Sequence, residues 1–588
     1  MRYSLLSGLV TGGLMALLLS CNSHDDNDIS WKAPESADRL KSPDQHLSLM
    51  ALKGKEIYDV YCWSCHGATG FGDGAAGKSL GQKPANFHDK KIRRQSDGAL
   101  FWKMSNGRAT MPAFEKVLSE EKRWQLVAYL RSMSFKAHNK IAPQALNPAI
   151  RVEHFMTVAS QSVRILRHPL NGSLWYTTFD GDVYKIKSDS AGNSAEKILT
   201  AGDHGIPRLQ GAVFLDDTLY LVGNVNSKDN TATSGRMVSV DLSEMGSKKI
   251  KVIFTTVQYG ANKTVYDHGW NAIEISPDKK YIYVNSGART DHGEVQDNGG
   301  MYPGARDNAL TSKIFRFPAG VKDLLLTDSL QKLKADGYLY AEGVRNVYDL
   351  AFDDKSNLFG VSNSPDYDMP EDMFWLREHH HYGFPWMAGG IENPQQFPDW
   401  DPAADPFISK SSHAWEVRYF HNDPTFPKKP EGVKFSPGVQ NLGPDANEYR
   451  GHTGKVLDGD TTGIAVSTFT AHCCPVGLCF DTHKQLAGNF KGAGFVIRYS
   501  LGARSSMMKP FTREGGDLLH LELSYDSAMD NYFVKTRRIV EGFTEPTDAI
   551  LVGNDLYIIE YGGMEGDIWK LTFPANKDVG AKKKTAKK

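Results

Sequence analysis

Cys62-Trp63-Ser64-Cys65-His66-Gly67 is the stretch that decides the fold of the first part of this chain. Its C-x-x-C-H spacing is that of covalent c-type haem attachment. Cys62 and Cys65 can add to the two vinyl groups of one porphyrin, and the His66 imidazole can bind the iron. A redox cysteine pair or half of a zinc site would also place two cysteines here, but His66 follows directly and the sequence has no second C-x-x-C. The motif therefore predicts one covalently bound haem c.

A haem iron takes a second axial ligand, and two methionines follow the motif. Met111 precedes Pro112, which favours the extended backbone that a loop crossing the haem face requires. Met104 is the competitor, but it ends a helix-like run, residues 97–104, where a buried core methionine is expected. We therefore expect Met111 to be the axial ligand.

Helical patterns flank the motif on both sides. Upstream, Ile57 and Tyr61 are four residues apart, and Gly54 is small enough for a close helix contact. Downstream, Ser119 is a suitable N-cap for a second helix. Residues 49–138 resemble the class I cytochrome c fold over its full length. The resemblance implies a small all-α electron carrier with His/Met ligation.

The N-terminus has the features of an export signal. One arginine is followed by an apolar run, residues 5–19, which is short for a membrane span. Residues 18–21, Leu-Leu-Ser-Cys, resemble the lipobox of bacterial lipoproteins, which implies a signal peptide at 1–20, lipidation of Cys21 and a polar tether at 21–48. An ordinary signal with a chance cysteine is the alternative. We expect a location on the periplasmic side of a bacterial membrane, at the outer membrane, held by lipid only.

Composition narrows the possible partners. The chain has 588 residues with 68 Lys plus Arg and 69 Asp plus Glu, so its net charge is −1. This balance argues against a nucleic-acid partner. Three cysteines remain beyond Cys21 and the haem pair, and they allow at most one disulfide whose pairing stays open: Cys473, Cys474 and Cys479.

The second part of the chain reads as β structure. After a linker at 139–150, short strands rich in β-branched and aromatic residues alternate with polar turns from 151 to 575, and a Lys-rich tail follows at 576–588. The irregular recurrence of strand pairs over this length predicts a β-propeller, which we expect to have six blades with long insertions. The whole chain is therefore expected to be multidomain: a small all-α domain followed by an all-β propeller.

Several loops of the second part contain motifs that are more specific than the strand-and-turn pattern of a propeller. Their order resembles that of the soluble quinoprotein glucose dehydrogenases and sorbosone-dehydrogenase-like proteins. The matching segments are 266–269 (Tyr-Asp-His-Gly), 342–352, 362–372, 382–386 (Tyr-Gly-Phe-Pro-Trp), 475–478 and 488–492. The resemblance implies an enzyme that binds pyrroloquinoline quinone (PQQ) and calcium.

The resemblance also implies roles for individual residues. His268 would be the general base that takes the hydroxyl proton of the substrate. Arg345, Asn346 and Lys491 would bind PQQ, and calcium would be held by oxygen atoms that include the carbonyls of Ser364 and Pro365. The family's Arg-x-Arg clamp has no counterpart in residues 544–550. The family's Gln-Gly-Arg turn is replaced here by Gly287-Ala288-Arg289, so Arg289 would substitute as a cation for PQQ.

The expected function is a quinoprotein dehydrogenase. A sugar, of the aldose or sorbosone type, or a polyol would be oxidised at PQQ, and the electrons would pass to the chain's own haem. A downstream cytochrome or respiratory-chain acceptor would then reoxidise the haem. Two alternatives stay open: a non-catalytic binding or sensor lipoprotein with an electron-transfer domain, and a metal-dependent sugar-lactone hydrolase.

Overall fold

The chain divides into two compact units, Met1–Lys136 and Ala137–Lys588, in a computed structural model. The structure describes residues 31–42, 47–67, 70–72, 74, 76–77, 80, 83–87, 89–134, 142–190, 192–229, 231–243, 249–260, 267–295, 304–410, 415, 418, 420–499, 511, 515–562 and 565–577. The expected signal peptide, the expected lipidation site Cys21 and most of the Lys-rich tail lie outside these residues. None of the described helices is long and apolar enough to span a membrane.

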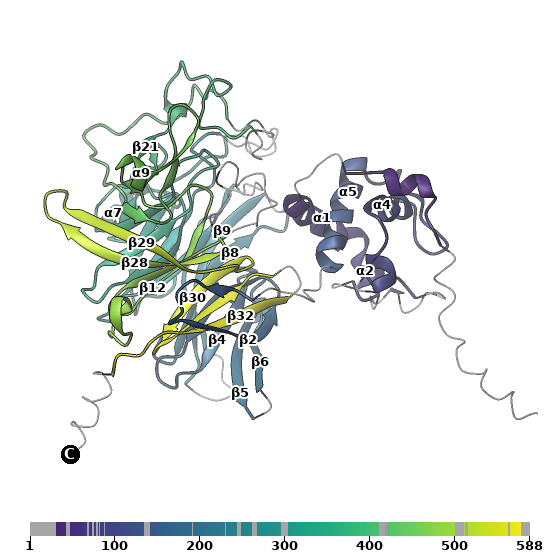
Figure 1. The fold of residues 1–588 in the computed structure, drawn as a ribbon, viewed down its shortest axis with the longest axis horizontal. Coiled ribbons are helices and arrows are strands. Elements are labelled where there is room, and N and C mark those ends of the chain that lie inside the picture. The colour runs from purple at the N-terminus through teal and green to yellow at the C-terminus, as the bar shows by residue number, and fades with distance from the viewer. Residues whose placement is uncertain are drawn as a thin grey trace, which may run out of the picture. The chain divides into compact units, whose positions relative to one another are not determined.

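The first unit is helical, as the sequence predicts (Figure 1). Its elements are η1 (Glu35–Arg39), α1 (Leu47–Tyr61), α2 (Trp63–His66), α3 (Lys90–Arg93), α4 (Asp97–Asn106) and α5 (Glu120–Ser134). Helices α1 and α5 pack against each other. They can do so because Gly54 has no side chain: a Cβ there would lie 2.1 Å from the Gln125 carbonyl oxygen. Ser119 caps α5 as predicted, since its Oγ accepts a hydrogen bond from Lys122 N at 3.2 Å.

The segment before α1 differs from a plain polar tether. Its short helix η1 packs against α4, and Ala37 is 1% exposed. A Cβ on Gly98 would lie 1.9 Å from the Ala37 carbonyl oxygen, and Ser96 Oγ donates a hydrogen bond to Asp38. Part of the expected tether, residues 31–40, therefore belongs to the helical unit.

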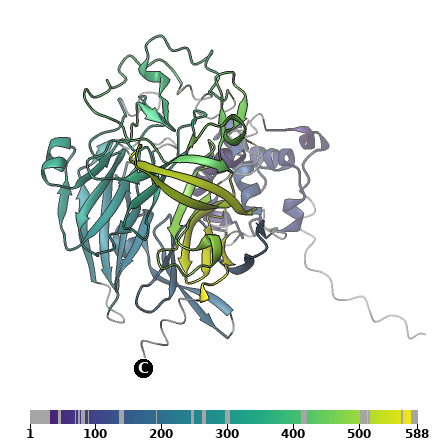
Figure 2. The same ribbon diagram turned by 60° about the vertical axis from the view of Figure 1, so that its left-hand side comes forward.

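The second unit consists of mainly antiparallel sheets arranged as a propeller, with parallel pairing only of β15 to β10 and of β22 to β29 among the described strands (Figures 1 and 2). The first two sheets are β3–β4–β5–β6 (Ser162–Arg167, Leu174–Thr178, Val183–Asp189, Gly192–Leu199), followed by α6 (Ala201–His204), and β7–β8–β9–β10 (Arg208–Leu215, Thr218–Asn226, Ala232–Asp241, Lys249–Thr256), which β11 (Tyr259–Gly260) and β15 (Leu324–Leu326) extend. The next two are β12–β13–β14–β16 (Trp270–Ile275, Tyr281–Ser286, Lys313–Pro318, Leu339–Glu342), with α7 (Leu330–Ala335) before its last strand, and β17–β18–β19 (Val347–Phe352, Leu358–Ser362, Asp372–Leu376).

The last two sheets combine strands from the N-terminal and the C-terminal parts of this unit. Strands β26–β29 (Pro475–Phe480, Gly494–Arg498, Asp517–Asp526, Asn531–Glu541), with η4 (Gly488–Phe490) between the first two, are joined by β1 (Gln144–Ala145), β22 (Gln440–Pro444) and β25 (Val466–Ser467). Strands β30–β32 (Pro546–Val552, Asp555–Glu560, Glu565–Thr572) pair with β2 (Arg151–Ala159). The N-terminal strand β2 therefore completes the sheet that the C-terminal strands begin.

The expected number of blades needs correction. Strands β3, β7, β12, β17, β26 and β30 pack in sequence around a closed ring. In the described part of the chain, five of the sheets have four or more strands, whereas β17–β18–β19 has three. The arrangement thus has five complete blades rather than six. After β19 the chain leaves the sheet for an insertion instead of adding a fourth strand. That insertion contains β20 (Met387–Ala388), β21 (Ile391–Glu392), η3 (Pro394–Gln396), β23 (Glu448–Arg450), β24 (Val456–Asp458) and α9 (Gly459–Thr462).

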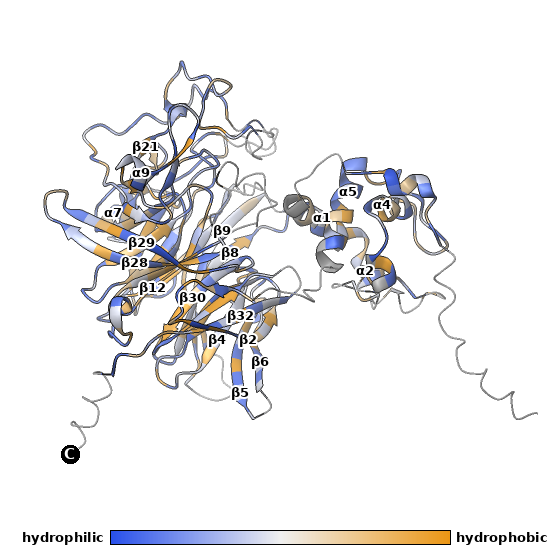
Figure 3. Ribbon diagram, viewed as in Figure 1, coloured by the Kyte–Doolittle hydropathy of each residue, from blue (hydrophilic) through white to orange (hydrophobic). Residues whose placement is uncertain are grey.

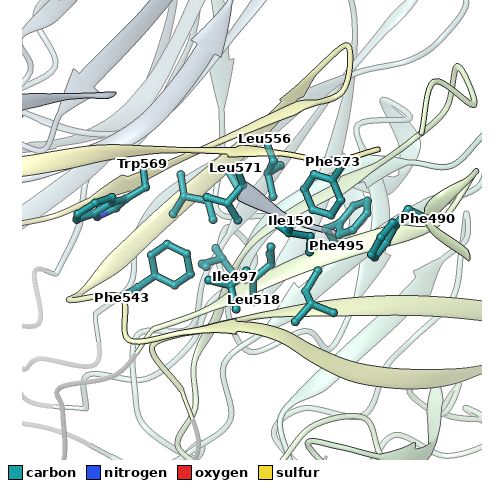
Figure 4. Packing of buried hydrophobic residues seen from close by; sticks show 14 of the residues in the cluster. Ile150, Phe490, Phe495, Ile497, Leu518, Phe543, Leu556, Trp569, Leu571 and Phe573 are labelled. Carbon is teal, nitrogen blue, oxygen red and sulfur yellow. The ribbon is translucent and has the colours of Figure 1, made fainter. Parts of the chain in front are cut away.

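Burial follows the distance of a strand from the ring. The ring strand β12 is buried along its first four residues, whereas the outer strand β6 is mostly exposed. Figure 3 shows the same contrast in hydropathy between the centre of the propeller and its outer strands. Between the last two sheets a core of aromatic and aliphatic side chains forms around Phe495, Leu518, Leu571 and Phe573, all at most 2% exposed (Figure 4). Burial of apolar side chains is the main stabilising contribution where two sheets pack in this way.

Candidate haem and propeller sites

The haem motif lies at the end of α1 and in α2. Cys62 N donates to the Tyr58 carbonyl oxygen at 2.9 Å, and His66 N donates to the Cys62 carbonyl oxygen at 2.9 Å. The chain therefore makes one tight turn that places both cysteines and His66 beside the same cavity. This cavity has a volume of about 890 Å³ and is lined by Cys62, Cys65, His66, Met104 and Met111. It lies within the range of about 300–1,000 Å³ typical of cofactor pockets.

His66 is held in the orientation that a metal ligand needs. Its Nδ1 lies 3.1 Å from the Ala85 carbonyl oxygen, and because a carbonyl can only accept, Nδ1 carries the proton. The ring also stacks on Phe87, with centroids 4.6 Å apart. Burial lowers the pKa of His66 below its usual value, which favours the neutral imidazole. The proton on Nδ1 leaves Nε2 as the atom with a lone pair for the iron.

Both candidate methionines line the cavity. Met111 lies in a turn closed by two hydrogen bonds with Arg108, and its side chain is half-buried. Met104, on α4, is 5% exposed, as expected of a core residue, yet it also reaches the cavity wall. The positions fit Met111 as the ligand and Met104 as packing, and this assignment stays a prediction.

The propeller site forms where two ring strands, β12 and β17, begin. His268 lies just before β12, and its Nδ1 donates to the Ala288 carbonyl oxygen at 3.0 Å. Ala288 N in turn donates to the Arg345 carbonyl oxygen at 2.6 Å, just before β17. A Cβ on Gly287 would lie 2.6 Å from His268 Cβ and 2.8 Å from Asn346 Oδ1. The loop 287–288 therefore brings together His268, Arg345 and Asn346, which are far apart in the sequence.

Arg345 is buried and engaged with protein groups. Its Nη2 lies 2.7 Å from Asp291 Oδ1, its Nε donates to the Asp291 carbonyl oxygen at 2.7 Å, and its Nη1 donates to the Asn363 carbonyl oxygen at 3.0 Å. Burial alone would raise the pKa of Asp291, but the hydrogen bond from His292 and the positive charges of His292 and Arg345 hold that pKa below its usual value. Arg345 and Asp291 thus form a buried ion pair.

The other two predicted cations make different contacts. Arg289 is buried, donates to the Arg306 and Gly260 carbonyl oxygens, and lies 5.4 Å above the Tyr259 ring. Lys491 is exposed in the loop between β26 and β27. That loop lies beside the turn between β17 and β18, since Lys484 and Asp354 are 2.7 Å apart. Arg345 and Asn346 lie at the other end of β17, so the structure does not bring Lys491 to His268.

The loop after β18 contains the expected calcium carbonyls. Ser364 N donates to Glu371 Oε2 at 2.8 Å, and Pro365 is buried. Burial raises the pKa of Glu371 to about 7, against hydrogen bonds from Ser364 and Cys474. Among the described residues, no group of three or more His, Cys, Asp or Glu side chains has the geometry of a metal site.

The sequence analysis did not identify the acidic residues around this site. Asp291 pairs with Arg345, and Asp368 lies 2.6 Å from His472 Nε2. Burial lowers the pKa of His472, but its hydrogen bond to Asp368 and the negative charges of Asp368, Asp366 and Glu371 together outweigh burial and raise that pKa to about 9. Only the pair Asp291-His292, a carboxylate next to a histidine after a strand, could have served as a signal in the sequence. None of the five described cysteines, which include Cys473, Cys474 and Cys479, forms a disulfide in the structure.

These residues fit one part of PQQ and not another. The quinone end of PQQ needs a base and hydrogen-bond donors. His268 can be the base, and the Asn346 amide and the buried Arg345 guanidinium lie beside it. The three carboxylates of PQQ need cations. Arg345 and Arg289 already bond to protein oxygens, and Lys491 lies at the far end of its blade, so the predicted cations do not fit the carboxylates.

Comparison with known proteins supports the division into two units. Residues 50–130 match the family model described as cytochrome c oxidase, cbb3-type, subunit III, so the helical unit contains a cytochrome c domain. No curated protein matches the chain.

Solved structures resemble the propeller at low identity. They include the PQQ domain of a pyranose dehydrogenase from Coprinopsis cinerea (12% identity, TM-score 0.42, covering 73% of this chain and 97% of that one). Two others are a soluble aldose sugar dehydrogenase from Escherichia coli (12%, 0.43, 72% and 99%) and the PQQ-bound aldose sugar dehydrogenase from Streptomyces coelicolor (16%, 0.40, 73% and 100%). At these identities and TM-scores the likeness does not extend to individual residues or to the reaction.

Proposed function

We propose that this protein is a haem-coupled dehydrogenase that oxidises a hydroxyl group of a sugar or polyol in its propeller and passes the electrons to its own haem c. The cytochrome c domain and the propeller in one chain support the pairing of the two activities. The single observation that carries the proposal on the propeller side is the bridge through Ala288, which joins His268 to Arg345.

His268 is the residue that moves the substrate proton in this proposal. The proton on its Nδ1 is held by the Ala288 carbonyl oxygen, so Nε2 is the atom that can accept the hydroxyl proton. Asn346 would orient the reacting group by a hydrogen bond, and the buried Arg345 would add positive charge where negative charge develops. When bound, PQQ would supply the two-electron acceptor for the hydrogen on the substrate carbon. Calcium at the carbonyls of Ser364 and Pro365 is part of the same proposal.

At the haem, Cys62 and Cys65 would form the two thioether links, and His66 Nε2 and Met111 Sδ would bind the iron. Haem c would supply a one-electron centre. Fusion of donor and acceptor domains raises the effective concentration of one near the other, so only reoxidation requires a second protein. Lipidation of Cys21 and a position on the periplasmic side of the membrane complete the proposal.

The proposal is tested by loading the purified full chain with PQQ and Ca²⁺ and measuring both binding and turnover. We expect about one PQQ per chain by mass and absorbance after release, with loss on chelation, and dye reduction with at least one aldose or polyol. His268→Gln is expected to keep PQQ and to lose about 10²–10⁴-fold in kcat. His154→Gln, on the outer strand β2, is the matched control and is expected to keep full activity.

The engaged cations favour a second candidate, a binding or sensor protein with a propeller that holds no quinone. Failure to retain PQQ, together with no turnover of any aldose or polyol, would replace the dehydrogenase by that candidate. Hydrolysis of a sugar lactone without PQQ would instead indicate a lactone hydrolase.

A further inference from the structure

One buried arginine reaches across the centre of the propeller ring. Arg164, on β3, is 3% exposed, and its Nη1 lies 3.2 Å from Asp349 Oδ1 on β17. In the order β3, β7, β12, β17, β26, β30, strand β17 is the third from β3 in either direction around the ring. The Arg164 side chain therefore spans the middle of the ring to reach the opposite blade.

Two carboxyls balance the charge of Arg164. Besides Asp349, Asp548 on β30 lies near it, with Oδ1 3.7 Å from Nη1. Burial raises the pKa of both carboxyls, and repulsion from Asp349 raises that of Asp548 further. Asp349, the nearer of the two, is therefore the charged partner of Arg164. An arginine buried in this way can be removed only at the cost of leaving that partner unpaired.

The other donors of Arg164 bond to main-chain carbonyls. Its Nε donates to the Gln210 carbonyl oxygen on β7 at 2.8 Å, and its Nη2 donates to the Tyr348 carbonyl oxygen on β17. The guanidinium also lies 4.6 Å from the centroid of the Tyr348 ring. Because a guanidinium presents its donors in a rigid planar fork, one arginine can hold two carbonyls and a carboxylate at set positions, which a single ammonium group cannot do.

Both carbonyls belong to segments that reach the propeller site. Gln210 Nε2 donates to the His268 carbonyl oxygen at 3.0 Å. Tyr348 lies two residues after Asn346 on the same stretch of chain. Arg164 thus connects the segments of His268 and Asn346 at a second point, in addition to the bridge through Ala288.

We propose that Arg164 is a positioning residue of the propeller site, which holds the β7 and β17 segments so that His268 and Asn346 keep their relative positions. The catalytic consequence rests on the proposed function, whereas the positions themselves can be measured without cofactor or substrate. Since Arg164 acts through other residues, its loss is expected to misplace His268 and to lower kcat rather than to weaken substrate binding.

The first test is hydrogen–deuterium exchange of the purified full chain without added PQQ, read by mass spectrometry. It follows two amides of the site, those of His268 and Ala288, which donate to the Ala288 and Arg345 carbonyl oxygens. Arg164→Met is expected to speed their exchange about tenfold, because the bonds that fix both segments are lost. Arg236→Met is the matched control: this half-buried arginine on the outer strand β9 is expected to leave the exchange unchanged.

Asp349→Asn separates positioning from charge balance. This variant keeps both carbonyl bonds of Arg164 and leaves Asp548 as the counter-ion, so we expect wild-type exchange. Arg164→Met alone leaves Asp349 unpaired and is expected to lower the midpoint of denaturant unfolding. The double variant Arg164→Met with Asp349→Asn removes the unpaired charge. It is expected to recover the midpoint but to keep the fast exchange.

Turnover supplies the second readout. In the PQQ- and Ca²⁺-loaded chain, Arg164→Met and the double variant are each expected to lose about 10–10²-fold in kcat, while KM stays within about threefold of the wild type. A rise in KM at unchanged kcat would contradict a positioning role for His268.

Slow exchange in the double variant would overturn the proposal, because charge balance would then explain the effect of Arg164. Fast exchange in Asp349→Asn would overturn it for the same reason. The double variant decides the question even if Arg164→Met alone does not fold. A wild-type chain without turnover would count against the dehydrogenase only, since the exchange measurements need no substrate and would still decide the role of Arg164.

Discussion

Two methionine side chains line the haem cavity, but only one of them can occupy the free axial position. Met111 lies in a hydrogen-bonded turn, whereas Met104 is packed on α4 at 5% exposure. Met111→Ala is expected to abolish the methionine–iron charge-transfer band and to lower the reduction potential, because a thioether stabilises reduced iron. Met104→Leu conserves volume and is expected to keep both properties, at a cost below about 1.5 kcal/mol in stability. The reverse pattern in absorbance and potentiometry would make Met104 the ligand.

Glu274, a half-buried glutamate on β12, links the stability of the propeller to pH. Burial, with added repulsion from Asp349 and Asp548, raises the pKa of Glu274 from 4.5 to about 8. Arg164 lies 3.2 Å from Asp349 and 3.7 Å from Asp548, so its charge is already shared between them. The folded state keeps the Glu274 proton up to about pH 8, while the unfolded chain releases it near 4.5. The free energy of unfolding therefore falls as pH rises through this interval.

Glu274→Gln removes this titration. We expect the variant to match the wild type near pH 5 and to exceed its stability at pH 9 by on the order of 1–3 kcal/mol. Denaturant unfolding of the full chain at both pH values, followed by tryptophan fluorescence, measures the difference. Glu392→Gln, at an exposed position, is the control and should show no such pH dependence. An equal offset at pH 5 and pH 9 would contradict the assignment.

At the scale of elements, the crossing of α1 and α5 depends on Gly54. A Cβ at this position would lie 2.1 Å from a backbone oxygen of α5, and the backbone cannot move away as a flexible side chain could. Gly54→Val is expected to destabilise the helical unit by about 1–3 kcal/mol or more and to reduce haem incorporation. Lys53→Ala, on the exposed face of the same helix, is expected to change stability by less than about 0.5 kcal/mol. Normal haem content and melting of Gly54→Val would show that the helices separate without penalty.

Helices and strands were predicted from the sequence more reliably than the contacts that loops make at the ends of the strands. The C-x-x-C-H motif, the Ser119 cap and the strand pairs such as β4–β5 and β31–β32 are local patterns, and the structure contains each of them. Lys491 was assigned to the cofactor site with His268 because residues 488–492 resemble a segment of the quinoprotein family, and such a resemblance gives order along the chain rather than position in space. The partners of Arg345 and Arg289 are residues of other loops, so spacing along the chain could not reveal them. The three-stranded fourth sheet was missed because the insertion after β19 contains short strands of its own.

At the scale of the whole molecule, the proposed function joins two redox activities in one polypeptide. The helical unit has the cysteines, the oriented histidine and the cavity that a haem c needs. The propeller places a base, an amide and a buried ion pair at the start of two ring strands. Neither unit alone would carry out the proposed reaction. The helical unit would have no substrate to oxidise, and the propeller would have no haem to accept its electrons.

The most direct test of the joined function is anaerobic stopped-flow mixing of the PQQ- and Ca²⁺-loaded full chain with an aldose or polyol that it oxidises. We predict that the haem absorbance changes to that of the reduced form with a rate constant independent of protein concentration, because transfer occurs within one chain. Oxidation of the substrate with the haem spectrum unchanged, or a rate that rises in proportion to protein concentration, would contradict it.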